Sequence, residues 1–280
     1  MIDILEILTP GLLATVQDGG RPGWRRFGIP PGGAMDRQAM HTANRLLDNR
    51  ADAAVLECLQ GTRLVALETV ELAAAGAWGA RAWRALAGET IEFPASLAGV
   101  WHYLAVPGGL AATHFLDSAS VCARAGIGAA LRQADRLACL SAPLGRLPTG
   151  VKARQPSEVP DYGDAPLGLW PGPQWDAFGE TSRATLLGHP WRITASCDRT
   201  GYRLGGAPLS PPTGNLASEP VRVGSIQVPP DGQPVVTLYD GPTVGGYPKI
   251  GILDPADLDR LVQARAGQKV RFRLCTPSSD

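Results

Sequence analysis

The stretch PVVTLYDGPTVGGYPKIGILDPADLDRL, residues 234–261, contains the three kinds of segment that recur along this chain. Its first six residues are mostly apolar and β-branched, which predicts a strand. A loop rich in glycine follows, beginning at Asp240. Asp254 and Pro255 then predict a helix start, because an aspartate accepts from free backbone N–H groups and proline has none to leave unpaired. The expected order is strand, loop and helix.

Strand patterns dominate the rest of the sequence. Residues 269–274 alternate apolar and basic side chains, and residues 191–195 alternate in the same way. Alternation with a period of two is typical of a strand with one buried face. Further strands are expected at 89–93, 102–106, 222–228 and 234–239. Two helices are expected, at 35–49 with Asp36 as cap and at 254–267. The 34 glycines and 25 prolines separate these short runs. We therefore expect a mainly β protein with a few helices, of the α+β class.

The composition excludes several kinds of protein. The 26 basic and 26 acidic residues give a formal net charge of zero, so the chain has no general electrostatic attraction to nucleic acid or to an anionic membrane. No apolar run reaches the roughly 18 residues of a membrane span. Asp3 and Glu6 stand where a signal peptide carries positive charge. The five cysteines and four histidines are scattered, which predicts buried thiols and no metal site. A cytoplasmic location is expected.

A proline-rich stretch, residues 141–175, divides the chain. We expect an N-terminal subdomain at 1–145, a Pro/Gly-rich connection at 146–174 and a C-terminal subdomain at 175–280. Strands shared across this boundary are compatible with the pattern.

The glycine loop after Asp240 is not a phosphate-binding P-loop. Gly241 and Gly246 have the required spacing, but Tyr247 stands where the lysine belongs and Pro248 where the hydroxyl belongs. Two interpretations remain open. The loop is either a structural turn, or a wall that lets a ligand approach the backbone at its glycines.

Two other stretches combine aspartate, arginine and glycine. They are LTPGLLATVQDGGRPGWRRFGIPPGGAMD (8–36) and CDRTGYRLGG (197–206). In each, the simple account is a surface turn with an Asp–Arg pair, which stabilises little when exposed. The alternative is a buried arginine whose planar fork of donors binds a carboxylate or an amide.

These stretches, together with SIQVPPDGQPVVTLYDGPTVGGYPKIG (225–251), resemble one family along nearly the whole chain. It is the biotin-dependent carboxyltransferase-like family, which includes allophanate hydrolase subunit 2 and the C-type subunit of 5-oxoprolinase. The resemblance implies a cyclophilin-like β-barrel in the C-terminal subdomain plus a second, smaller subdomain. It also implies a homologous sister chain, similar to the B-type subunit of 5-oxoprolinase, and a lactam-utilisation subunit. Such an assembly opens 5-oxoproline to glutamate with ATP.

The resemblance also implies which residues form the site. The expected catalytic residues are Asp240, Thr243, Tyr247 and Lys249. The expected substrate-binding residues are Gln17, Asp18, Arg21, Asp198, Arg199, Arg203, Gln227, Gly245 and Gly246. We expect the ligand cleft where these motifs meet, with Thr243, Tyr247 and Lys249 facing inward. No metal and no cofactor motif are expected in this chain; ATP would be used by the assembly. The substrate is a small amide or lactam.

The middle of the chain departs from the family pattern. Trp101 and His102 replace the usual arginine region, LDSAS (116–120) replaces GSxST, and Ala134 stands where glycine is typical. DGPT (240–243) replaces the common DRQT. These departures leave room for a different substrate, for weak activity, or for a regulatory binding partner of the sister subunit. Half of a biotin-dependent carboxyltransferase acting on urea or a related amide is a further alternative.

Overall fold

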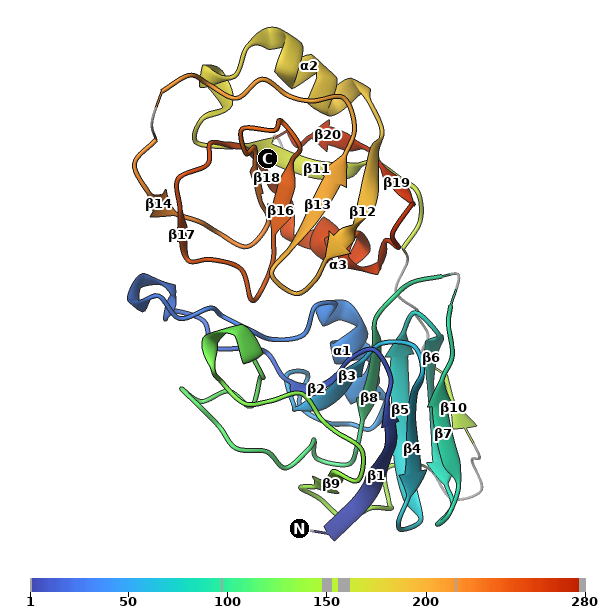
Figure 1. Ribbon diagram of the computed structural model, residues 1–280. Coiled ribbons are helices and arrows are strands. Elements are labelled where there is room, and N and C mark those ends of the chain that lie inside the picture. Colours follow the sequence, from blue (N-terminus) through green and yellow to red (C-terminus); the bar gives the residue numbers. More distant parts are fainter. Residues whose placement is uncertain (1, 97, 148–152, 156–161, 215, 277–280) are drawn as a thin grey trace. The chain divides into compact units, whose positions relative to one another are not determined.

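The computed structural model describes residues 2–96, 98–147, 153–155, 162–214 and 216–276 (Figure 1). The chain forms two compact units. The first comprises Met1–Pro22 and Gly32–Asp161, and the second comprises Gly23–Pro31 and Tyr162–Asp280.

The first unit contains one α-helix and two sheets among its described residues. Its elements are β1 (Ile2–Pro10), β2 (Ala14–Gln17), α1 (Arg37–Leu46), β3 (Val55–Cys58), β4 (Thr62–Ala66), β5 (Val70–Gly76), β6 (Gly79–Ala85), β7 (Thr90–Phe93), β8 (His102–Ala105), the 3₁₀ turn η2 (Ala123–Ala125), β9 (Arg136–Cys139) and β10 (Ala153–Arg154). One sheet has the order β7-β4-β1-β9 and the other β10-β6-β5-β8-β3-β2.

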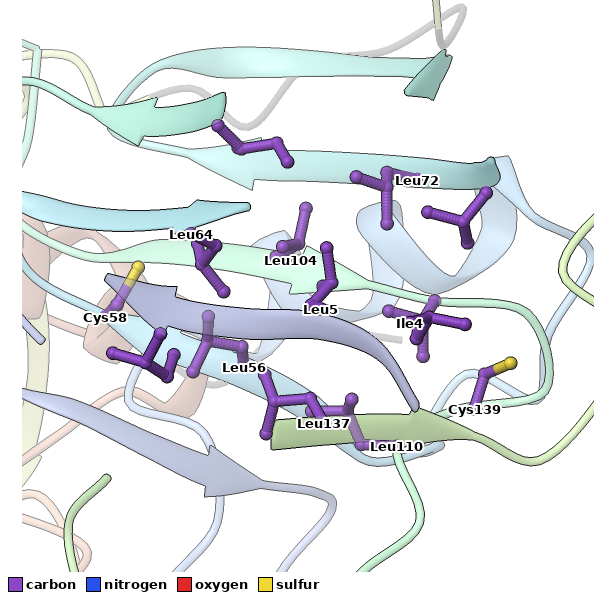
Figure 2. Packing of buried hydrophobic residues seen from close by; sticks show 14 of the residues in the cluster. Ile4, Leu5, Leu56, Cys58, Leu64, Leu72, Leu104, Leu110, Leu137 and Cys139 are labelled. Carbon is purple, nitrogen blue, oxygen red and sulfur yellow. The ribbon is translucent and has the colours of Figure 1, made fainter. Parts of the chain in front are cut away.

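The core of the first unit is built from both sheets. Ile4 and Leu5 from β1 and Leu64 from β4 lie in one buried cluster with Leu56 from β3 and Leu104 from β8 (Figure 2). Because successive side chains of a strand point to opposite faces, the intervening residues of the six-stranded sheet lie on its other face. Helix α1 contacts β5, β6 and β8, so the central strands of this sheet are buried on both sides.

Helix α1 begins where the sequence predicts. The Asp36 carboxylate accepts a hydrogen bond from the backbone N–H of Ala39 at 2.8 Å, which satisfies a donor of the first turn. The side chains that α1 buries include Met40, Ala43 and Leu46, which lie on one stripe of the helix.

The second unit is a curved sheet with two α-helices among its described residues. Its elements are η1 (Arg25–Phe27), β11 (Leu167–Pro171), η3 (Trp175–Ala177), α2 (Glu180–Gly188), β12 (Trp191–Cys197), β13 (Gly201–Gly205), β14 (Glu219–Pro220), β15 (Ser225–Gln227), β16 (Val235–Thr237), β17 (Val244–Gly245), β18 (Lys249–Leu253), α3 (Pro255–Gln263), β19 (Lys269–Val270) and β20 (Phe272–Leu274).

The eight-stranded sheet of this unit is nearly closed into a barrel. Its strand order is β19-β12-β13-β16-β15-β18-β11-β20, so its two end strands follow each other along the chain. Only Arg271 separates them, and its carbonyl accepts from Leu167 N at 2.8 Å. The sheet must therefore curl until its ends meet, which confirms the expected mainly β fold with a barrel and few helices. Strands β14 and β17 form a separate two-stranded ribbon.

Three details differ from the sequence expectations. Leu167–Pro171, assigned above to the connection, is a strand of the barrel, because its edges pair with β18 and β20. The helix expected at 254–267 ends at Gln263, because Ala264 has extended backbone dihedrals. The strand expected at 269–274 is interrupted at Arg271.

Candidate functional site

Asp18, from the N-terminal motif, lies in the first unit in a cage of hydrogen-bond donors. Its carboxylate accepts from the Ser118 hydroxyl at 2.7 Å, from the Ser120 hydroxyl, and from the backbone N–H groups of Gly20 and Ala119, both at 2.7 Å. The Asp18 N–H donates back to Ser120 Oγ. The LDSAS segment, which departs from the family pattern, thus supplies the donors that fix Asp18.

Arg21 and Gln17 are buried in the same unit and bind backbone carbonyls. Arg21 donates from Nε to Phe115 O at 3.3 Å and from Nη2 to Ser120 O. Gln17 Nε2 donates to Val121 O at 2.9 Å and to Thr15 Oγ1 at 3.1 Å. All three residues of the motif therefore hold the segment 115–121 against β2.

In the second unit, Arg199 and Asp240 form a buried ion pair. Arg199 Nε lies 2.8 Å from Oδ2 of Asp240, and Nη2 lies 3.0 Å from Oδ1. Both side chains are less than a tenth exposed. This bidentate geometry is the strong form of an arginine–carboxylate contact. It joins the turn after β12 to the segment that follows β16, and the two residues are 41 positions apart in the sequence.

Lys249, at the start of β18, is the second buried charge of this unit. Its ammonium donates to Glu219 Oε1, and its exposed fraction is 2%. Gln174 completes the cluster: its Nε2 donates to Glu219 Oε1 at 2.8 Å, and its Oε1 accepts from Lys249 N at 2.9 Å. The hydrogen bond from Lys249 lowers the pKa of Glu219 below its ordinary value. The ammonium is thus held beside an ionised carboxylate.

The glycines of the loop 240–249 serve packing within the unit. A side chain at Gly245 would lie 3.0 Å from Gln227 Nε2, and one at Gly241 would lie 2.5 Å from Thr237 Cγ2 and 2.7 Å from Thr200 O. Gln227 in turn accepts from Thr237 Oγ1 at 3.1 Å. The first of the two interpretations, a structural turn, therefore accounts for these two glycines.

The outer part of this loop is open to solvent. Tyr247 is 49% exposed and Val244 58%. Gly246 is also exposed and Thr243 is half-buried. Lys249 begins a barrel strand and is buried, whereas Tyr247 precedes that strand and is exposed, so the two side chains differ in burial.

Asp198 and Arg203 are surface residues with local roles. Asp198 Oδ1 accepts from Thr200 N at 2.7 Å and from Gly201 N at 3.2 Å, which stabilises the turn between β12 and β13. Arg203 Nη1 lies 2.8 Å from Asp231 Oδ2 in an exposed pair. These contacts are compatible with the surface-turn interpretation of this stretch.

Three positions of this unit that were not among the expected catalytic or binding residues take part in the site. Gln174 and Glu219 hold Lys249, as described. Arg25 Nη2 donates to Pro242 O at 2.9 Å and to Val221 O, and so fastens η1 to the 240–249 loop. Burial lowers the pKa of Arg25. Both acceptors are backbone carbonyls, which every residue has, so the sequence alone could not have identified these two contacts.

The first unit contains a further buried network beneath α1. Tyr103 Oη donates to Glu57 Oε2 at 2.9 Å and accepts from Asp36 N at 2.7 Å, and Met35 N donates to the same Glu57 oxygen at 2.7 Å. Burial raises the pKa of Tyr103 well above its ordinary value. The phenol is therefore a fixed donor that ties β3 to the helix start.

Chemically, the second unit offers a buried ammonium and an exposed phenol on either side of Pro248. Such groups can bind and polarise a carbonyl oxygen. Within the described part of the chain, no cluster of three or more His, Cys, Asp or Glu side chains is arranged to hold a metal ion. No helix within the same ranges is long and apolar enough to cross a membrane.

Comparisons with known proteins place these features in a family. The sequence model of the carboxyltransferase domain, subdomain A and B, matches residues 27–274. The chain is 34% identical to the C-type subunit of 5-oxoprolinase from Escherichia coli, over 98% of this chain and 92% of the relative. It is 33% identical to the Haemophilus influenzae protein of the same name.

More distant relatives and solved structures agree with this. Urea amidolyase of Lachancea kluyveri is 26% identical over 95% of this chain, which corresponds to 17% of that much longer protein. The crystal structure of TTHA0988 superposes with a TM-score of 0.87 at 34% identity, covering 97% of this chain. The present chain spans 56% of the TTHA0988 chain. On this evidence the protein belongs to the carboxyltransferase-domain family that includes the C-type subunit of 5-oxoprolinase.

Proposed function

We propose that this chain is one subunit of an ATP-dependent 5-oxoprolinase, which opens a lactam amide and releases glutamate from 5-oxoproline. The observation that carries the proposal is the match to the C-type subunit of that enzyme, which extends over 98% of this chain and 92% of the Escherichia coli relative. Partners that complete the activity are a homologous sister chain of the B type and a lactam-utilisation subunit. In this proposal the assembly uses ATP, and a partner subunit binds it, because this sequence has no recognised nucleotide motif.

In this proposal, the charged cluster of the second unit binds the lactam. Lys249, fixed by Glu219 and Gln174, and the phenol of Tyr247 donate to the lactam carbonyl oxygen, where negative charge develops on attack at the carbonyl carbon. The Arg199–Asp240 pair holds the loop that carries them. Arg199 is thus a positioning residue, because its fork of donors is already taken by Asp240.

The test is ATP-dependent glutamate release from 5-oxoproline by the co-expressed subunits, with this chain present and omitted. Lys249→Ala is expected to lower turnover by about a hundredfold, as loss of a transition-state donor does. Lys269→Ala, at an exposed lysine of β19, is the matched control and should retain full turnover.

Tyr247→Phe provides a second variant that does not endanger folding, because the ring is half-exposed. It is expected to lower turnover about tenfold. Full activity of both site variants in a properly assembled complex would reject the site assignment. Equal glutamate release without this chain would reject the function.

A second candidate has its own support. The urea amidolyase match and the carboxyltransferase family model favour half of a biotin-dependent carboxyltransferase that acts on urea or a related amide. Its test is incorporation of labelled bicarbonate into urea that depends on both this chain and a biotinylated carrier. Labelled product in that assay, with no glutamate release in the first, would favour this candidate.

A further inference from the structure

The first unit contains a cavity of about 340 Å³, lined only by residues of that unit. Part of its polar wall is already engaged. The Asp18 carboxylate is caged by Ser118 and Ser120, as described above. Asn49 Oδ1 accepts from Gly108 N at 2.7 Å and its Nδ2 donates to Val106 O at 2.8 Å. The hydrogen-bonding groups of these two side chains are used within the chain, so they have little hydrogen-bonding capacity left for a ligand.

Two opposite charges in the lining remain unused. They are those of Asp117, which is exposed, and Arg146, which is half-buried. Neither side chain has a hydrogen bond or an ion pair with any other residue that the structure describes, including each other. Their separation therefore exceeds ion-pairing distance although both border one space. By contrast, Arg50 and Asp52 in the same lining pair with each other at 3.0 Å.

Both unused charges sit on anchored backbone. Asp117 lies in a tight turn closed by Phe115 N to Ser118 O at 2.9 Å and Ser118 N to Phe115 O at 3.2 Å. Its φ is 62°, a left-handed value that aspartate tolerates better than most residues. The backbone N–H groups of Arg146 and Leu147 donate to the fully buried carboxylate of Glu71. A ligand would meet charges whose backbone is already fixed, which reduces the entropy lost on binding.

We propose that this cavity binds a small zwitterion with one ammonium and one carboxylate, the arrangement of an α-amino acid. Arg146 binds the carboxylate, for which its planar fork of donors is suited, and Asp117 binds the ammonium. The volume is in the range of small-molecule sites, roughly 300–1,000 Å³. This site lies outside the Lys249 cluster and does not depend on the proposed lactam hydrolysis.

The test is isothermal titration calorimetry on the full chain with L-glutamate and L-alanine as probes. Their N-acetyl derivatives lack the ammonium, and their α-amides lack the α-carboxylate. At least one of the two amino acids is expected to bind, and each of its derivatives about tenfold or more weakly, as loss of a charged hydrogen bond predicts. Absence of binding by both amino acids would overturn the proposal, as would equal binding of either derivative.

Variants locate the binding. Asp117→Asn and Arg146→Gln should each weaken the amino acid about tenfold or more. Glu68→Gln and Arg124→Gln, at exposed positions of the same unit outside the lining, are the matched controls and should bind as the unaltered chain does. Unaltered affinity in the two lining variants would place the ligand elsewhere.

5-Oxoproline has the carboxylate but no ammonium, so it separates this inference from the proposed function. We expect 5-oxoproline to bind more weakly than the amino acid. Binding of 5-oxoproline that is as tight and equally sensitive to Arg146→Gln would overturn the zwitterion assignment. The glutamate-release assay does not enter this comparison.

Discussion

Arg199 and Arg203 lie four positions apart, and each pairs with an aspartate. Arg199 and Asp240 are both less than a tenth exposed, whereas Arg203 and Asp231 are 41% and 54% exposed. A buried charge that loses its partner remains in surroundings that solvate it poorly, whereas an exposed charge is solvated by water. The two pairs therefore differ in what their loss costs, although their N–O distances are the same 2.8 Å.

Replacing each arginine by glutamine tests this difference. Arg199→Gln leaves the Asp240 carboxylate without its counter-charge and is expected to lower the free energy of unfolding by about 3–5 kcal/mol. Arg203→Gln, the matched control, should change it by about 1 kcal/mol or less. Urea-induced unfolding followed by circular dichroism measures both. Equal losses in the two variants would mean that burial of the Arg199 pair has no energetic consequence.

At the level of single residues, the sequence predicted local roles such as helix caps better than it predicted long-range hydrogen-bond and ion-pair partners. Asp36 and Asp254 act as helix caps, as expected, because capping is a local interaction. The partner of Arg199 is Asp240, not the neighbouring Asp198, and all but one of the donors around Asp18 come from residues about a hundred positions later. Such pairings depend on which strands lie side by side, which a pattern in one segment does not encode.

Strand β8 begins with a histidine that the fold buries almost completely. The exposed fraction of His102 is 1%, and its ring centroid lies 5.3 Å from that of Phe93. Its Nδ1 has no hydrogen-bond partner within the described ranges. Burial lowers the pKa of His102 to about 4, so the neutral ring is the form that fits the strand.

This burial predicts a dependence of stability on pH. The unfolded chain takes up the proton near pH 6.5, but the folded chain does so only near pH 4. Stability is therefore fully present above pH 6.5 and decreases as the pH falls towards 4, by about 3 kcal/mol over the whole range. His102→Leu should remove this part of the pH dependence of the unfolding free energy.

The measurement compares urea unfolding at pH 7.5 and pH 5. The decrease between the two values should be smaller in His102→Leu than in the unaltered chain, whatever the variant's absolute stability. His189→Leu, at an exposed histidine, should keep the unaltered decrease. If His102→Leu also keeps it, the buried ring does not titrate in the way that its surroundings indicate.

Among the elements, those with a regular period were predictable and those without one were not. The alternating segment 191–195 lies within β12, and the helix capped by Asp254 begins where expected, although it ends at Gln263. Strand β11 was hidden in a proline-rich stretch, because its sequence LGLWP does not alternate apolar and polar residues. Gln174, which holds Lys249 and Glu219, lies in the same proline-rich stretch. It was missed because that stretch shows no regular period.

For the whole molecule, the notable element is the short segment Gly23–Pro31. It belongs to the second unit, while the residues before and after it belong to the first. Arg25 attaches it through the carbonyls of Val221 and Pro242. Nothing in its sequence is periodic, so its assignment to the distant C-terminal unit could not be predicted.

Replacing Gly23–Pro31 by a Gly/Ser linker of equal length should loosen the second unit. Amide hydrogen exchange is expected to speed up in residues 219–245, because the carbonyls at 221 and 242 lose their donor. An equivalent replacement of residues 123–128, which lie in the first unit, should leave exchange at 219–245 unaltered. Unchanged exchange there in the first variant would show that the segment contributes nothing to that unit.

The same segment limits how the gene can be divided by recombination. The backbone passes from one unit to the other at three places, after Pro22, Pro31 and Asp161. A recombination event that carried residues 162–280 into another gene would therefore leave Gly23–Pro31 behind, and with it the guanidinium that fastens the 240–249 loop. We therefore expect recombination to keep the two units together in one gene, even though each has its own sheets.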